Sequence, residues 1–555
     1  MFFRLVALNC RYTHSCLALY CLRTVLLERF GSNCRIEIEE RTINDPYYET
    51  LLAMTADRVA VLFFSVSIWN AAYVTRLIRD IRQILPELPI IVGGPQVSHG
   101  GGDQLAGFCT TVKGAAEGLG DDFFGDLAAG FLKPSYTAGL PVSFPYPYRS
   151  EDFASTLVNR SIYYEASRGC PFSCSYCLSS VEKGMLVKDL ATVQRELVAL
   201  LDQKPKTLRF VDRTFNTRPE RALAIWQFLL EQPGDTVFHF EMAPDRFTDE
   251  MFSFLQTVPP GRFRFEIGLQ STNPITLREI RRNMDLDLAL SHIMRLAAMD
   301  RIHLHVDLIL GLPHETETSY LASFDDVFAL APHYIQMGLL KLLPGTIMAA
   351  KREQYGMRAC LEPPYELLAS RWLDAAMLGR LYLFGECVEA MYNNRYFRTF
   401  WHCLNGQSTK ASSFFMAILE IAELPEFAGR TKNQELLSTI LHRFAEKRTD
   451  RELLVDLLRH DWLACGHRFL PDHLHRQEDR ELRRMLSRRL PQNLPPYYSY
   501  RGRDEFIKRS MFLRISNAAR RHLGLPEDEE GCLCFLPERG GGVFGLQQKI
   551  WLPFD

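Results

Sequence analysis

The segment SRGCPFSCSYCLSS (residues 167–180) contains three cysteines, Cys170, Cys174 and Cys177, in a C-x3-C-x2-C spacing. It overlaps the end of the strand-like run SIYYEAS (161–167) and is therefore predicted to form a strand-to-helix loop. Barrels of alternating strands and helices place their chemistry in such loops, at the carboxyl ends of the strands. The three thiols are therefore expected at the mouth of a barrel-like domain.

The number of thiols bears on what they bind. A closed structural zinc site takes four ligands. Three thiolates can bind three irons of a four-iron cluster and leave the fourth iron open. The spacing thus favours a [4Fe-4S] cluster with one open iron. Two alternatives are a zinc site completed by a distant ligand and three unrelated buried thiols.

Strand-like and helix-like patterns alternate around this loop. Strand-like runs occur at 161–167, 207–212, 236–242, 263–269, 302–310 and 333–340. Apolar residues at helical spacing lie between them, at 187–202, 218–231 and 274–298. Six strand–helix units predict a partial (βα)6 barrel.

The first 130 residues contain another alternating series. Strands are predicted at 2–9, 35–41, 57–67, 88–98 and 109–118, and helices at 14–30 and 69–85. This alternation predicts a Rossmann-like, doubly wound parallel sheet, which binds ligands at the carboxyl ends of its strands.

The remaining segments complete a three-domain α/β organisation. A proline-rich link (132–153) follows the first unit, and helical patterns such as 365–384 and 414–424 dominate beyond about residue 347. The charged run 475–490 carries both signs and is interpreted as a solvated helix face. The predicted domains span 1–140, 155–346 and 347–555.

Composition limits the partners of the chain. The 555 residues are 47% hydrophobic and 23% charged, with a formal net charge of −2. A near-neutral chain gives no electrostatic case for binding nucleic acid or an anionic membrane. No apolar run approaches the roughly 20 residues that span a bilayer. A cytoplasmic protein is expected, with most of its 14 cysteines as reduced thiols.

The cysteine segment resembles the C-x3-C-x-aromatic-C loop of the radical S-adenosylmethionine (SAM) superfamily, with Tyr176 at the aromatic position. The resemblance implies that the amino and carboxyl groups of SAM chelate the open iron. One-electron transfer to the sulfonium then cleaves a carbon–sulfur bond and typically gives a 5′-deoxyadenosyl radical. It also implies an external electron donor of the flavodoxin or ferredoxin type.

Further strand ends resemble the SAM-binding motifs of this superfamily. The residues that match are Glu241 in FHFEMAPD (238–245), Gln270 and Ser271 in EIGLQSTNP (266–274), and Asp307 and Gly311 in VDLILGLPHET (306–316). REIRRNMD (278–285) offers Arg281 or Arg282 as a partner for the SAM carboxylate. Each of these side chains, like Asp212 and Asn216 after the second barrel strand, could instead be a paired polar group at a strand end.

The first domain resembles the cobalamin-binding domain of cobalamin-dependent radical SAM enzymes. Ser65, Gly93 and Gly94 lie toward the carboxyl ends of predicted strands and suit close packing against a large flat ligand. The D-x-H-x-x-G motif, which supplies a cobalt ligand in other cobalamin proteins, is absent. His14 follows the first predicted strand but does not stand within such a motif. The alternative is a domain that keeps this fold without the cofactor.

Three functions follow from these resemblances. The leading hypothesis is a cobalamin-dependent methyl or alkyl transferase acting on a small molecule. The second is transfer of the 3-amino-3-carboxypropyl group of SAM, without cobalamin, to a soft acceptor held by thiols such as Cys532 and Cys534, which would share one face of a strand. The third is a non-catalytic cobalamin or redox sensor.

Overall fold

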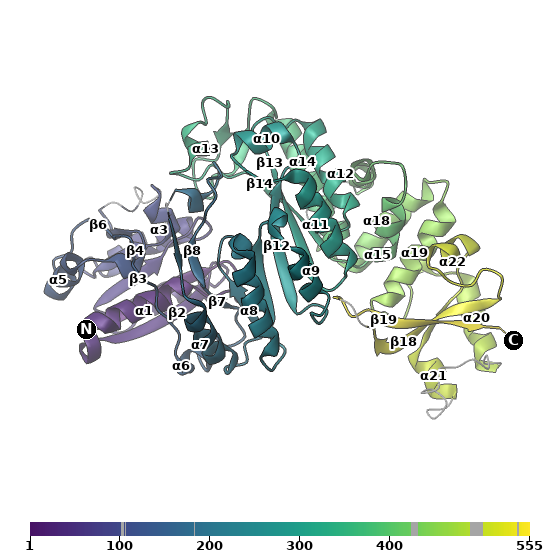
Figure 1. The fold of residues 1–555 in the computed structure, drawn as a ribbon, viewed down its shortest axis with the longest axis horizontal. Helices are drawn as coiled ribbons and strands as arrows, with labels where there is room; N and C mark the ends of the chain where they lie inside the picture. Colours follow the sequence, from purple (N-terminus) through teal and green to yellow (C-terminus); the bar gives the residue numbers. More distant parts are fainter. Residues whose placement is uncertain are drawn as a thin grey trace.

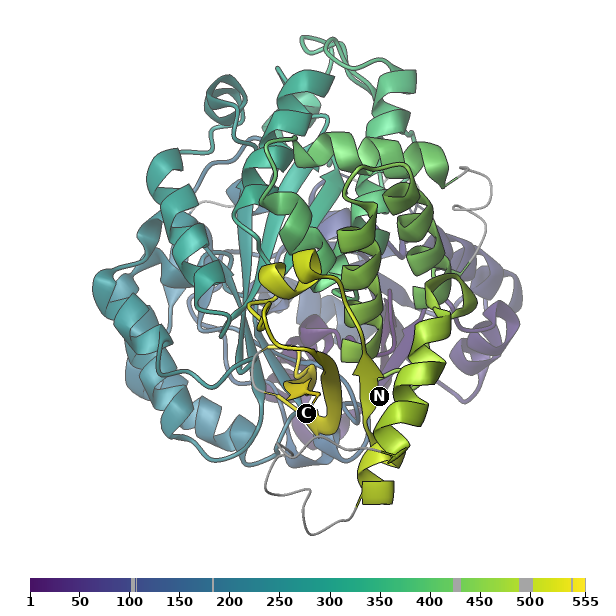
Figure 2. The same cartoon turned by 90° about the vertical axis from the view of Figure 1, so that its right-hand side faces the viewer.

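Two parallel sheets and a mainly helical region follow one another along the long axis of the molecule (Figure 1). The computed structural model describes residues 1–100, 105, 107–181, 184–422, 431–488, 503–540 and 543–554. Figure 2 views the molecule from the C-terminal end, so that the C-terminal helices and strands lie nearest the viewer. The predicted α/β fold class is confirmed.

The first sheet contains six parallel strands in the order β2-β1-β3-β4-β5-β6. Their bounds are β1 Phe2–Asn9, β2 Arg35–Thr42, β3 Val61–Ser65, β4 Ile90–Gly93, β5 Thr110–Lys113 and β6 Ser135–Thr137. The strand order reverses at β1, between β2 and β3, and doubly wound sheets bind ligands at such a switch point.

Helices cover both faces of the first sheet. The apolar side chains of α1 (Leu17–Phe30) and α5 (Asp121–Ala129) pack in one core cluster. Those of α2 (Tyr47–Thr55) and α3 (Ala71–Ile84) pack in another. The carboxyl edge of the sheet is left for loops, which is where the sequence predicts a ligand.

The second sheet also has six parallel strands, in the order β14-β13-β12-β11-β10-β7. Its strands are β7 Ile162–Tyr164, β10 Thr207–Phe210, β11 Val237–Met242, β12 Phe263–Gln270, β13 His303–Leu310 and β14 Tyr334–Leu339. Its main helices are α7 Leu190–Leu201, α8 Pro219–Glu231, α9 Asp249–Leu255, α10 Pro274–Glu279, α11 Leu286–Ala298 and α12 Glu317–Ala329. This is the predicted partial barrel.

Burial alternates along the barrel strands because successive side chains point to opposite faces. On β13, Leu304, Val306 and Leu308 are fully buried in the main hydrophobic core. His305 and Asp307, between them, are only partly buried. One face of the sheet therefore holds the core and the other presents polar side chains.

The C-terminal region packs directly on the barrel. Its helices include α14 Ala375–Val388, α15 Arg398–Asn405, α16 Ala411–Ile421, α18 Gln434–Glu446, α19 Arg451–Ala464, α20 Gln477–Arg488, α21 Arg503–Arg509 and α22 Asn517–His522. Phe384 and Phe415 from this region share one core with Phe324 of the barrel. A three-stranded antiparallel sheet, β17 (Met511–Leu513), β18 (Gly531–Arg539) and β19 (Gln547–Pro553), completes it.

Two predicted helices differ from the structure. The pattern at 274–298 forms two helices, because Arg281 adopts a positive φ of 58° and Asp285 caps α11 through the amide of Leu288. In the pattern at 365–384, only the part from Ala375 is helical, since Leu367 donates its amide to Leu340 and opens a short strand, β16 (Leu367–Ala369).

Two strand assignments also change. The proline-rich link contains β6, which adds an edge strand to the first sheet. The run 161–167 ends as β7 at Tyr164, and Ser167–Gly169 forms a separate strand, β8. The three-domain division remains a prediction. Within the described residues, no helix is long and apolar enough to cross a membrane.

Candidate cofactor-binding site

The three-cysteine loop is held at the mouth of the barrel. Its stem, β8, pairs antiparallel with β9 (Met185–Val187). Within the loop, Ser180 Oγ donates hydrogen bonds to the carbonyls of Cys174 (2.9 Å) and Cys177 (2.7 Å). The amide of Ser175 bonds the carbonyl of Ile280 at 2.9 Å, across the barrel mouth. The loop backbone is therefore fixed by neighbours on both sides.

All three cysteines line one cavity of about 170 Å³, here called the cysteine cavity. Its other lining residues are Phe172, Tyr176, Ser179, Ser180, Arg213, Thr214, Glu241, Met242, Glu266, Gly268, Gln270, Arg282 and Asp307. Side chains from the carboxyl halves of three barrel strands thus face the thiols.

The three cysteines share one cavity, as the ligands of an iron–sulfur cluster must. Within the described ranges, no three His, Cys, Asp or Glu side chains converge on a point where one ion could bind. In a four-iron cluster each iron takes its own thiolate, so the thiols need only face a common space. Cys170, Cys174 and Cys177 meet that condition.

Of the two arginines predicted to bind the SAM carboxylate, Arg282 lines the cavity and Arg281 does not. Arg282 Nη2 donates to the carbonyl of Gly268 at 2.5 Å, and its Nη1 lies 3.8 Å from Cys174 Sγ. The positive φ of Arg281 turns the chain between α10 and α11, so that the two neighbouring side chains diverge. Arg282 thus places a cation beside the thiols, and its buried Nε has no hydrogen-bond partner among the described residues.

Burial shifts two of the three acids of the cavity, Glu241 and Asp307, toward their neutral forms. It raises the pKa of Glu241 to about 7, with Arg213 Nη1 3.9 Å away acting in the opposite direction. It also raises the pKa of Asp307, whose Oδ1 lies 3.0 Å from His305 Nε2. A cationic ligand in the cavity would favour the charged carboxylates.

Gln270 lies at an irregularity in the sheet. It adopts a φ of 76°, and the pairing of β12 with β13 shifts register between Gly268 and Gln270. The shift directs the Gln270 side chain into the cysteine cavity, as its lining shows.

Ser271 and Gly311 do not line the cysteine cavity. Ser271 is buried; its hydroxyl donates to Glu315 and accepts from the amide of Asn273 at 2.9 Å. At Gly311 an added Cβ would lie 2.4 Å from Leu367 Cδ2. Ser271 therefore fixes the loop after β12, and Gly311 leaves room for Leu367 of the C-terminal region.

Asp212 and Asn216 are hydrogen-bonded to neighbouring loops. Asp212 accepts from the amide of Ala166 (3.0 Å) and from Ser167 Oγ (2.5 Å). Asn216 exchanges two hydrogen bonds of 2.8 Å with Ala243. Both therefore brace the strand ends. Arg213 and Thr214, which lie between them in the sequence, line the cavity instead. Nothing in the motif RFVDRTFN indicates which of these four residues face the cavity.

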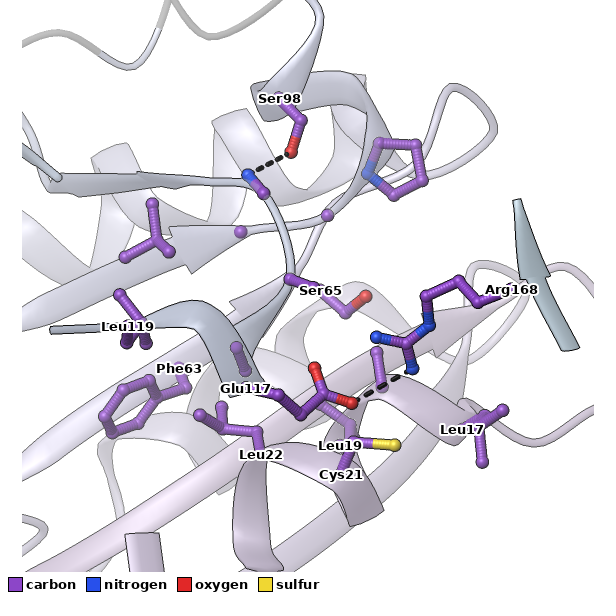
Figure 3. A pocket seen from close by; sticks show the side chains of 18 of the residues that line it. Leu17, Leu19, Cys21, Leu22, Phe63, Ser65, Ser98, Glu117, Leu119 and Arg168 are labelled. Atoms are coloured by element: carbon purple, nitrogen blue, oxygen red, sulfur yellow. Dashed lines mark hydrogen bonds and ion pairs between the residues drawn. The ribbon is translucent and has the colours of Figure 1, made fainter. Parts of the chain in front are cut away.

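A larger cavity of about 480 Å³ lies at the carboxyl edge of the first sheet and is called the sheet-edge cavity (Figure 3). Ser65, Gly93 and Gly94 all line it. Much of its surface is apolar and comes from Leu17, Leu19, Leu22, Phe63, Leu119 and Phe123. The predicted ligand-side loops therefore do meet around one space.

Gly94 shapes the floor of this cavity. Its φ is 102°, and an added Cβ would lie 2.6 Å from the carbonyl oxygen of Val66. Asn70 fastens the same region, because its amide donates to the carbonyls of Leu8 (3.0 Å) and Ser65 (3.1 Å). The loops after β3 and β4 can approach this closely only with glycine at position 94.

Arg168, just before the cysteines, joins the two domains across the sheet-edge cavity. Its Nη2 contacts Glu117 (3.0 Å) of the first domain and Glu165 (2.7 Å) beside the barrel strand β7; Figure 3 shows the Glu117 contact. Its Nη1 is buried without a hydrogen-bond partner. A donor is thus left in the wall of the cavity for a ligand.

Two histidines follow strands of the first sheet, and they differ in whether they line the sheet-edge cavity. His14 Nδ1 contacts the hydroxyl of Tyr163 at 2.5 Å and does not line the cavity. His99 does line it, after the short helix α4 (Pro95–Ser98). No motif in the sequence marks His99, since it stands outside any cobalt-ligand motif.

The two cavities meet. Ser179 and Arg213 line both of them. Ser179 follows the last cysteine and Arg213 follows the second barrel strand. Two ligands, one in each cavity, would therefore face each other past these side chains.

Cys532 and Cys534 lie elsewhere. Both are fully buried on β18, in a core with Leu482, Phe506 and Phe512. Burial raises the pKa of Cys532 to about 12 and raises that of Cys534 well above its ordinary value, which favours the protonated thiol at both positions. Neither lines the cysteine cavity or the sheet-edge cavity.

Comparison with known families agrees with this geometry. Residues 164–327 match the family model described as the radical SAM superfamily. The central domain belongs to the radical SAM superfamily. Residues 353–511 match a second model, described as a protein of unknown function (DUF4080).

Curated relatives align over part of the chain. A cobalamin-dependent radical SAM methyltransferase, TokK of Streptomyces tokunonensis, is 26% identical over 339 residues, covering 54% of this chain and 49% of its own. A 2-(S-pantetheinyl)-carbapenam-3-carboxylate methyltransferase of Streptantibioticus cattleyicolor is 25% identical over 299 residues, covering 47% and 43%. The chain spans about half the length of these relatives.

Two solved structures share the fold. OxsB, a cobalamin-dependent SAM radical enzyme solved with aqua-cobalamin and SAM, has a TM-score of 0.57 at 13% identity and covers 83% of this chain and 78% of its own. The radical SAM methyltransferase TsrM from Kitasatospora setae, with tryptophan and a SAM analogue, has a TM-score of 0.50 at 19% identity and covers 66% and 79%.

Proposed function

We propose that this radical SAM protein is a cobalamin-dependent transferase that moves a methyl or other alkyl group to a small molecule. The observation that carries the proposal is the meeting of the cysteine cavity with the sheet-edge cavity at Ser179 and Arg213. A transfer between two cofactors requires their reacting ends to face a shared space. The printed descriptions of the curated relatives, both methyltransferases, support the same reaction class.

The residues of the cysteine cavity fit a cluster and SAM. Cys170, Cys174 and Cys177 would hold the cluster, and the cationic Arg282, whose Nε is unpartnered, would bind the SAM carboxylate. When bound, the cluster would supply the electron that cleaves SAM. Glu241 and Asp307 would attract the positive charges of SAM, whose arrival lowers the pKa of both carboxyls.

The sheet-edge cavity has features that fit a corrin. Its apolar walls suit the faces of a large ring, and the unpartnered Arg168 Nη1 can donate to a side-chain amide at the ring edge. When bound, cobalamin would supply the transferred group. The bracing of Arg168 by Glu117 and Glu165 holds this donor in position.

The proposal includes an external one-electron donor of the flavodoxin or ferredoxin type and a small-molecule substrate. The donor is required because cleavage of SAM consumes an electron. The alternative aminocarboxypropyl transfer loses its structural motivation, since burial in the core of the C-terminal sheet favours the protonated thiols of Cys532 and Cys534.

Anaerobic reconstitution tests the proposal. The full chain, loaded with iron, sulfide and hydroxocobalamin, is expected to retain corrin after gel filtration and to form 5′-deoxyadenosine from SAM under reducing conditions. With an acceptor present, methyl transfer would also yield S-adenosylhomocysteine. Methylthioadenosine as the SAM product, or no retained corrin, would contradict the cobalamin-dependent reaction. No SAM consumption with any acceptor would favour a sensor.

A further inference from the structure

A third cavity, of about 490 Å³, lies at the opposite end of the barrel from the cysteines. Asp300 and His333, which line it, directly precede β13 and β14, whereas the cysteine cavity lies at the carboxyl ends of the barrel strands. Its other wall comes from the C-terminal region. It is called the basic cavity, from its side chains Arg395, Arg398, Lys549, His333, His402 and His522.

Positive charge in the basic cavity is only partly balanced. Asp300 is the single carboxylate among its described lining residues, and it contacts His333 (3.0 Å) and Arg398 (3.6 Å). Asp461 lies behind the wall, where it accepts from Thr399 Oγ1 and the amide of Phe400. Two arginines and one lysine, whose pKa is lowered by burial, thus face one lining acid.

The two arginines are held side by side before any ligand arrives. Their guanidinium groups lie over the ring of Phe544, at 5.6 Å for Arg395 and 5.4 Å for Arg398. The same ring contacts His333, with a centroid distance of 5.5 Å. Stacking of this kind reduces the side-chain entropy that two arginines lose when they clamp an anion.

Polar atoms in this cavity lack partners. Arg395 Nε and His522 Nε2 are buried without a hydrogen-bond partner among the described residues. Burial and the neighbouring His402 lower the pKa of His522, and burial with Arg395 and Arg398 lowers that of His333. The unpaired N–H of the buried Arg395 Nε is costly, and a bound anion can accept its hydrogen bond.

We propose that the basic cavity binds the phosphate group of a phosphorylated small molecule. Arg395 and Arg398 would bind the oxyanion, and Lys549, which contacts His460 at 3.1 Å, would add a third charge. The volume falls within the range of small-molecule sites. The site is separate from both cofactor cavities, so this proposal does not depend on the transfer reaction. It gives the region matching DUF4080 a ligand-binding role.

Titration calorimetry on the cluster-reconstituted full chain tests this site. The probes are inorganic phosphate and pyrophosphate, at constant ionic strength set with chloride. The wild type is expected to bind both saturably, with pyrophosphate bound more tightly. Arg398→Gln should weaken binding about tenfold, the worth of one charge-assisted contact. The matched control Arg195→Gln changes an exposed arginine on α7 and should leave binding unchanged.

Arg398 also contacts Asp300 and Phe544, so Arg398→Gln removes structural contacts as well as a ligand donor. A second variant therefore separates loss of binding from loss of stability. Lys549 is exposed on β19, so Lys549→Gln should keep the melting temperature and still weaken pyrophosphate binding several-fold. The proposal is overturned if the wild type does not bind either probe, or if Lys549→Gln and Arg195→Gln bind pyrophosphate equally well. Loss of corrin or cluster binding would not change either result.

Discussion

The cysteine cavity and the sheet-edge cavity share a border but recognise ligands by different physics. The first is small and ionisable, with Glu241, Arg282 and Asp307 around the thiols. The second is nearly three times as large, with apolar walls and glycine turns. Charge complementarity selects a small charged reagent, whereas apolar area and close backbone approach select a large flat one. Mutations should therefore separate the two binding events.

The largest effect is expected from Cys174→Ala. Loss of one thiolate should leave the cluster unable to assemble, because each iron needs its own ligand. Iron and sulfide analysis should fall to background, and 5′-deoxyadenosine formation should disappear. Corrin retention should stay, since Cys174 does not line the sheet-edge cavity. Cys360→Ala, at a partly buried cysteine outside both cavities, is the control and should keep a full cluster.

The cysteine cavity could be predicted in large part because its ligands are close in sequence. Spacing alone placed Cys170, Cys174 and Cys177 together, and strand-end position placed Glu241, Gln270 and Asp307 at the same mouth. Parallel strands bring their carboxyl ends to one edge whatever the connecting helices do. Local pattern therefore sufficed to bring these distant residues to one cavity.

Residues whose surroundings come from distant segments were harder to predict. Ser271 bonds Glu315, and Gly311 makes room for Leu367 of the C-terminal region. Arg281 and Arg282 are neighbours, and only a backbone turn decides which faces the cavity. Arg168 gains its position in part from Glu117, which lies beside the first sheet, and no local pattern encodes that contact.

The next effect concerns the backbone of the sheet-edge cavity. Gly94→Ala would place a Cβ 2.6 Å from the Val66 carbonyl at a φ of 102°. Strain and overpacking together should destabilise the protein by about 2–5 kcal/mol. Corrin retention should fall at least tenfold while the cluster still assembles. Gly125→Ala, on α5 with no atom within 4 Å of the new Cβ, should be neutral or slightly stabilising. Equal corrin retention in both variants would contradict this role of Gly94.

A smaller effect should follow from Asp212, which braces the residues before the cysteine loop. Burial raises its pKa to about 6 from an ordinary value of 3.8. The folded state then holds a proton that the unfolded state releases, so stability should be highest below about pH 4 and fall as the pH rises to 6. The loss should be about 2–3 kcal/mol. Urea unfolding of Asp212→Asn should lack this slope.

Asp189→Asn is the control for the urea-unfolding measurements, because the pKa of Asp189 is shifted in the opposite direction from that of Asp212. Hydrogen bonds from Thr192 lower the pKa of Asp189, so its contribution to stability is present above its ordinary pKa and is lost as the pH falls. If Asp212→Asn kept the wild-type decline between pH 4 and 6, the carboxyl of Asp212 would not be its source.

The smallest effect on stability, and the sharpest test of the shared border, should come from Arg213→Gln. Its side chain is 56% exposed and lies 3.9 Å from Glu241, so the change in unfolding free energy should stay within about 0.5 kcal/mol. Because Arg213 lines both cavities, loading the wild type with hydroxocobalamin should change its rate of 5′-deoxyadenosine formation several-fold. The variant should lose most of that dependence while retaining both cofactors. An undiminished response to corrin in Arg213→Gln would mean that the two cavities communicate by another route, with Ser179 the remaining residue common to both.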